Sequence, residues 1–138
     1  IKLLHESDVL REVTSVCHYR WSLRLLVALG RGEANRFCLF ERRLGINPQS
    51  LSKHLAHLIQ LGWVEKNEGY GHPLRPDYIL TARGRMVATA AIPCWELIER
   101  KRLEEVMKAK WSIPAMTGLA IHPHSFVSLR SALRTTSR

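Results

Sequence analysis

The chain has 138 residues, which is enough for one ordinary domain and marginal for two. Apolar residues make up 46% of it, so disorder along the whole chain is excluded. Lys and Arg number 21 against 12 Asp and Glu, which gives a net charge of +9 and favours a polyanionic partner. Charge alone does not separate DNA from RNA or from an anionic membrane.

The cysteines and the hydropathy pattern indicate the compartment. Three cysteines, at positions 17, 38 and 94, have no paired spacing, which fits a reducing cytosol and predicts a cytoplasmic protein. No apolar run reaches about 18 residues, and no secretory segment follows the first residue, so we expect no membrane partner. Because the first residue is Ile, we expect the sequence to be a fragment or to lack an N-terminal segment.

Apolar periodicity predicts helices through the first half of the chain. Their expected ranges are about 8–18, 21–29, 36–44 and 48–61. Ser7 is expected to cap the first helix, and Gly30 with Gly32 to end the second. Gly45 should end the third, and Asn47 should cap the fourth, with a proline at its first position.

A β-hairpin and a long helix follow. The strands are expected at 63–66 and 77–80, around a loop tip at 69–76 that is rich in Gly and Pro. Thr81 should cap a fifth helix of about 82–108, in which Pro93 predicts a kink or break. The predicted fold is therefore mainly α with a small β-hairpin: a winged helix-turn-helix with a long C-terminal helix.

The helix at 48–62 is the candidate reading helix, the one that enters the major groove of duplex DNA. With Leu51, Leu55 and Leu58 facing inward, the opposite side carries Gln49, Lys53, Ala56 and Gln60, flanked by Ser50, Ser52 and His57. Gln can read adenine bidentately, and Lys can donate to guanine or to a phosphate. A helix N-terminus also favours a phosphate.

Further contacts to the DNA backbone are predicted on both flanks. The hairpin tip carries His72 and Arg75, and an Arg on a wing can follow the backbone or enter a narrow minor groove. Arg36 and Arg43 near the third helix could hold flanking phosphates. Residues 31–57 contain five Lys or Arg and two Glu, so the expected DNA face is positive.

Other functions find less support. A capped amphipathic helix is often only a solvated surface, and a winged helix can be a protein-interaction module that binds nucleic acid non-specifically; this stays as the alternative. The pairs His54/His57 and His122/His124 lack further ligands, so neither a metal nor a cofactor is expected. No catalytic arrangement stands out, and we expect no enzyme. We also consider a small-molecule effector pocket between the first and fifth helices, whose ligand the sequence does not indicate.

An ordered set of short motifs carries a family resemblance. It comprises Trp21-Ser22, Arg36-Phe37, the run from Leu44 to Pro48, Leu51-Ser52, Leu55, the run from Leu58 to Glu65, His72-Pro73, Arg75-Pro76, Tyr78, Leu80-Thr81 and Gly84. Over about residues 15–96 the chain resembles the HxlR-type regulators of bacteria. The resemblance implies duplex operator binding, usually as a two-fold dimer built from the first and last helices. It also implies a reading helix at 48–57 and Arg75 on the wing; the cysteine sensing of some members is not carried over to Cys17.

The end of the chain partly repeats its beginning. Trp111-Ser112-Ile113 matches Trp21-Ser22-Leu23 at an offset of 90 residues, and apolar positions continue the match. The predicted organisation is a winged helix-turn-helix domain at 1–98, a charged connector helix at 99–110, and the start of a second winged-helix repeat at 111–138. We therefore expect double-stranded DNA as partner, and either a homodimer or an intramolecular pseudo-dimer of tandem domains.

Overall fold

The computed structural model of the protein describes residues 5–67 and 76–136, which are mainly helical with one two-stranded antiparallel sheet. The predicted fold class, mainly α with a small hairpin, is confirmed. By its contacts the chain divides into residues 21–101 and a unit that joins residues 1–20 to 102–138. Residues 1–20 thus group with the C-terminal helices, an association that the predicted organisation did not include.

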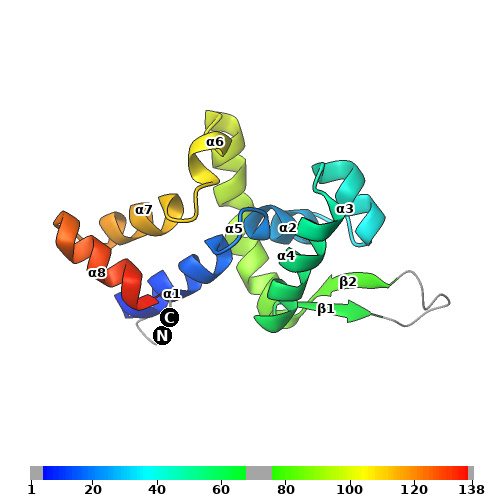
Figure 1. Ribbon diagram of the computed structural model, residues 1–138, viewed down its shortest axis with the longest axis horizontal. Coiled ribbons are helices and arrows are strands. Elements are labelled where there is room, and N and C mark those ends of the chain that lie inside the picture. The colour runs from blue at the N-terminus through cyan, green and yellow to red at the C-terminus, as the bar shows by residue number, and fades with distance from the viewer. Residues whose placement is uncertain (1–4, 68–75, 137–138) are drawn as a thin grey trace. The chain divides into compact units, whose positions relative to one another are not determined.

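Residues 21–101 form the winged helix-turn-helix unit (Figure 1). Its elements are α2 (Ser22–Gly30), α3 (Phe37–Leu44), α4 (Pro48–Gln60), β1 (Val64–Asn67), β2 (Asp77–Leu80) and α5 (Ala82–Lys101). The core side chains Leu26, Phe40, Leu51, Leu55 and Leu58 are at most 2% exposed. Three of these five lie on α4, so its apolar side is fixed and its opposite side must face outward.

The turn between α3 and α4 has the predicted chemistry. Gly45 has a φ of 66° and ends α3 in the left-handed conformation that glycine tolerates best. The side chain of Asn47 accepts a hydrogen bond of 2.8 Å from the Ser50 amide, and Pro48 occupies the first turn of α4. The predicted cap and the predicted start of this helix are confirmed.

The hairpin is attached to the start of α5 through close backbone contacts. Its strands pair antiparallel, from Val64 opposite Leu80 to Asn67 opposite Asp77. The Thr81 hydroxyl accepts from the Gly84 amide at 3.0 Å and donates to the Gly62 carbonyl at 2.7 Å, so Thr81 caps α5 as predicted. The base of the wing and the first turn of α5 are therefore held in one geometry.

Two predicted helix boundaries are wrong, and the break expected at Pro93 is not found. Helix α5 is not broken at Pro93 and ends at Lys101 rather than at 108, after which Arg102 takes a φ of 54°. Thr89 and Pro93 are both exposed, so water can reach the carbonyl that the proline leaves without a donor. At the N-terminus, α1 (Glu6–Cys17) begins after His5, and Ser7 lies inside the helix instead of capping it.

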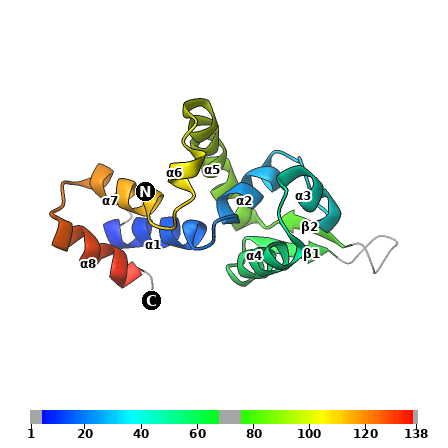
Figure 2. The ribbon, with the colours of Figure 1, turned by 45° about the horizontal axis from the view of Figure 1, so that its top comes forward.

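The second unit consists of α1, α6 (Glu104–Met107), α7 (Ser112–Ile121) and α8 (Phe126–Thr136). Figures 1 and 2 both show α1 alongside α7 and α8. At the contact, Gly118 of α7 faces Leu10 of α1 and Leu129 of α8, so the three helices pack against one another. The predicted connector helix is divided between the end of α5 and the short α6.

Candidate nucleic-acid interface

Helix α4 divides into a buried and an exposed side, as the leucine spacing predicts. Gln49, Lys53 and Gln60 are exposed, opposite the buried leucines. Ser52 and Ala56 are also exposed, while Ser50 and His57 are half-buried at the edges of the polar side. The first two turns of α4 thus present short and long hydrogen-bonding side chains from a capped helix end, the arrangement that can approach base edges.

Arg36 lies beside the loop end of the hairpin and is paired with Asp77, the first residue of β2. Its Nε donates to Asp77 Oδ1 at 2.8 Å, and the backbones of the two residues form an isolated β-bridge. The hydrogen bond and the charge of Asp77 raise the pKa of Arg36. Arg43, in the last turn of α3, is exposed. The sequence predicted phosphate contacts for both residues, and the structure adds that Arg36 also anchors the wing.

The two predicted residues of the wing, His72 and Arg75, lie outside the described residues, and so does most of the loop 69–76. Around the gap, Asn67 ends β1 and Asp77 begins β2, which confirms that a long connection joins the strands. Their proposed contacts therefore rest on the sequence.

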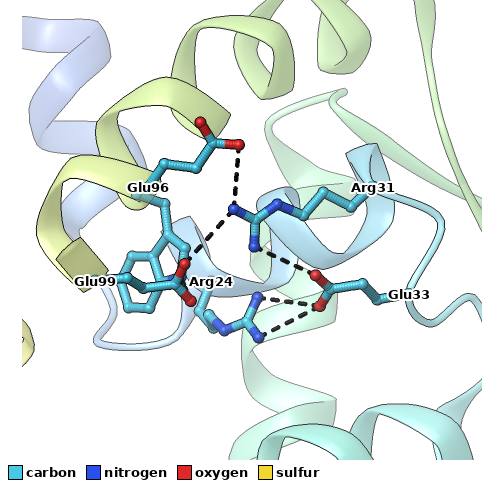
Figure 3. Close-up of polar contacts among 6 residues, drawn as sticks. Arg24, Arg31, Glu33, Glu96 and Glu99 are labelled. Carbon is cyan, nitrogen blue, oxygen red and sulfur yellow. Dashed lines mark hydrogen bonds and ion pairs between the residues drawn. The ribbon is translucent and has the colours of Figure 1, made fainter.

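A network of charged residues fastens α2 to α5 (Figure 3). Both terminal nitrogens of Arg24 lie 3.3 Å from Glu33 Oε2, and Arg31 lies 3.3 Å from Glu33 Oε1. Arg31 also reaches Glu96 at 3.5 Å and Glu99 at 3.6 Å on α5. Arg31, which the sequence counted toward the positive DNA face, is thus paired with three carboxylates.

His54 lies on the buried side of α4 and is 7% exposed. Its Nδ1 is hydrogen-bonded to the Ser50 carbonyl oxygen. Burial lowers the pKa of His54; the Ser50 hydrogen bond opposes this effect, and the nearby charges of Lys53 and His57 add to it. The sequence placed His54 in a possible chelating pair, whereas the structure makes it a core side chain that is held neutral.

We expect the pH dependence of stability to report this neutral histidine. At pH above about 6.5 His54 is neutral in both states. Below that pH the unfolded chain binds the proton first, so the free energy of unfolding falls by up to about 1.4 kcal/mol per pH unit until the folded pKa is reached. Urea titrations at pH 7.5 and 5.5 should show a smaller difference for His54→Leu than for the parent chain. Equal differences would contradict this role.

The described residues include the three cysteines and most of the histidines. Within them, no group of three or more His, Cys, Asp or Glu side chains could hold a metal ion. Cys17 is half-buried, Cys38 and Cys94 are exposed, and partial burial of the Cys94 thiol raises its pKa. A raised pKa leaves less reactive thiolate at neutral pH.

Two helices joined by a glycine turn, the second capped and polar outside, followed by a hairpin, define a winged helix-turn-helix protein. A family model described as HxlR-like helix-turn-helix matches residues 16–105, and the chain belongs to this family. The family's members are DNA-binding transcription regulators rather than enzymes, so this chain is a DNA-binding regulator of transcription. Among curated proteins and solved structures, no significant match was found. Every helix in residues 5–67 and 76–136 is too short or too polar to cross a bilayer.

Proposed function

We propose that the protein is a cytoplasmic, sequence-specific repressor that reads duplex DNA with α4 in the major groove. The observation that carries the proposal is the division of α4 itself. Its leucines are fully buried while Gln49, Lys53 and Gln60 are exposed along the other side. Because the helix is held firmly on its buried side, its backbone need not rearrange to present the exposed side to DNA.

Different residues carry base reading and phosphate binding in this proposal. Gln49, Ser50, Ser52 and Lys53 occupy the first two turns of α4 and reach base edges, with His57 beside them. Arg43 on α3 contacts the flanking backbone, and so do His72 and Arg75 from the wing at 69–76. Arg36 contributes by fixing the wing to α3 through Asp77, with its remaining donors directed to a phosphate. Repression follows from occlusion of the polymerase.

We further propose that two reading units act together, either in a homodimer or in a pseudo-dimer of tandem domains. Support comes from the likeness of α7 to α2. Trp21, with φ −98° and ψ −7°, precedes α2, and Trp111, with φ −101° and ψ −6°, precedes α7. The next helix of each pair, α3 or α8, begins at a phenylalanine.

The exposed apolar side chains of α7 and α8 support the proposal that these helices contact a partner. Leu26 on α2 is fully buried, whereas its counterpart Met116 on α7 is 55% exposed, and Phe126 on α8 is 78% exposed. Large apolar side chains exposed together are typical of contact surfaces. Sedimentation of the protein with a bound operator duplex should give two chains per palindromic site for the homodimer. Single chains on single half-sites would contradict both forms of the proposal.

DNase footprinting on the DNA upstream of the protein's own coding sequence tests the proposed function. We expect one protected window that appears before general protection, because specific contacts add to the charge-driven attraction. General protection without a window would favour the alternative, a winged-helix interaction module that binds nucleic acid non-specifically.

A further inference from the structure

A groove of about 480 Å³ lies within the 21–101 unit, beside the C-terminal end of α2. It is open to solvent and is lined by the end of α2, the loop that follows α2, β2 and the first half of α5. Its lining residues include Leu29, Leu80, Ala88 and Ile92 as apolar walls. The volume falls within the range of small-molecule sites in proteins. The groove lies between the second and fifth helices, whereas the sequence-based hypothesis placed an effector pocket between the first and fifth.

Two glycines shape the groove. A Cβ on Gly30 would lie 3.1 Å from both Ala88 Cβ and Ile92 Cδ1, so α2 and α5 approach closely at its inner end. Gly32 has a φ of 69°, and a Cβ there would meet nothing within 4 Å. The chain therefore turns beside the groove at a residue whose backbone conformation favours glycine.

The charge of the groove is positive. Among its described lining residues Arg85 is the only charged one, and no carboxylate lines it. Arg85 Nη1 donates to the Leu80 carbonyl at 3.2 Å, which holds the guanidinium over the end of β2. A guanidinium carries five N–H donors, so donors beyond this bond remain. One turn further along α5 the Thr89 hydroxyl donates to the Arg85 carbonyl at 2.7 Å, and Asn35 adds an amide across the groove.

We propose that this groove binds a small amphipathic organic anion, a carboxylate with a compact apolar body. The body packs on Leu29, Ala88 and Ile92, and the carboxylate accepts hydrogen bonds from Arg85. Charge complementarity selects the anion, because a neutral apolar molecule would leave the remaining donors of the guanidinium beside an apolar surface.

The position of the groove links such a ligand to the wing. Strand β2 forms one wall, and the Tyr78 amide in that strand donates to the Asn35 carbonyl at 2.7 Å. A ligand that binds between α5 and β2 would therefore contact one strand of the hairpin. An effect of the ligand on DNA binding through the wing rests on the proposed function. Binding of the ligand to the groove does not.

Amide NMR shifts of the full chain, labelled with ¹⁵N and titrated with 2-naphthoate, test the site. We expect saturable shifts at Gly30, Gly32 and Thr89 and none at Gly118 in the other unit. Arg85→Gln should weaken binding about tenfold, while Arg100→Gln, an exposed arginine of α5 away from the groove, should leave it unchanged. Thr89→Trp should abolish binding by filling the groove, and the neutral 2-naphthylmethanol should bind about tenfold more weakly.

Several results would overturn the proposal. These are an absence of saturable shifts at the groove, equal affinity in the Arg85→Gln protein, and equal affinity for the neutral alcohol. Shifts of the groove amides with protein concentration alone would show that a second chain occupies the groove. The amide spectrum of each variant reports whether it is folded. Because the experiment contains no DNA, loss of the proposed DNA specificity would leave its result unchanged.

Discussion

Gly84→Ala is expected to destabilise the protein by about 3 kcal/mol or to prevent folding of the 21–101 unit. A Cβ at this position would lie 1.8 Å from the Trp63 carbonyl oxygen and 2.7 Å from the carbonyl carbon. Both are backbone atoms, so no rotamer change can relieve the overlap. The same carbonyl oxygen accepts a 3.0 Å hydrogen bond from the Thr81 amide, which ties the hairpin to the cap of α5. Any shift that makes room must break this connection.

The sign of this effect is unusual for a helical glycine. Replacement of Gly by Ala in an exposed helix stabilises it by about 1 kcal/mol, so helix propensity predicts the opposite result. Urea unfolding followed by circular dichroism measures the difference. Gly30→Ala is the matched control, because its Cβ would lie 3.1 Å from Ala88 Cβ and Ile92 Cδ1, an overlap that a shift of a few tenths of an ångström relieves. We expect a loss below about 1 kcal/mol. An unchanged or raised stability for Gly84→Ala would contradict the close approach.

Removal of the reading side chains has the second large effect, on DNA discrimination rather than on stability. Gln49→Ala and Lys53→Ala should each lower the preference for the best operator over a scrambled duplex by about tenfold or more. A good bidentate contact to a base is worth about 1–3 kcal/mol of discrimination. Both side chains are exposed on α4, so the free energy of unfolding should change little.

Competition binding against a pool of operator variants measures this discrimination. Gln60→Ala provides the control: it lies on the exposed side of the same helix but in its last turn, away from the capped end. We expect its preference to equal that of the parent chain. If Gln49→Ala and Lys53→Ala weaken binding to all duplexes alike, α4 does not read bases in the proposed orientation.

Local sequence signals were sufficient for the helix-turn-helix. The spacing of Leu51, Leu55 and Leu58, the Gly45 turn and the Asn47-Pro48 start each depend on neighbours in the chain, and all are confirmed. Partners far apart in sequence could not be predicted in this way. Arg36 pairs with Asp77, 41 residues away, and Arg31 with Glu96, 65 residues away. A count of charges along one segment therefore leaves out the carboxylates that the fold brings from distant parts of the chain.

The end of α5 and the groove beside it also could not be predicted from local sequence signals. Its charged pattern continues beyond Lys101, and the stop depends on Arg102 entering the left-handed region without the usual glycine. Arg85 and Thr89 were not singled out, although a spacing of four residues on one helix places them on the same face. Their relation to β2 and to the end of α2 emerges only from the packed structure.

Fluorescence anisotropy of labelled duplexes titrated with the protein, at two salt concentrations, tests the central claim most directly. The duplexes are its own upstream DNA and a scrambled sequence of the same composition. We predict a preference of at least about a hundredfold, or about 2.7 kcal/mol, that persists at the higher salt while the charge-driven part of the affinity falls. If the protein binds both duplexes with equal affinity, and both affinities fall alike as the salt concentration rises, sequence-specific reading by α4 is contradicted.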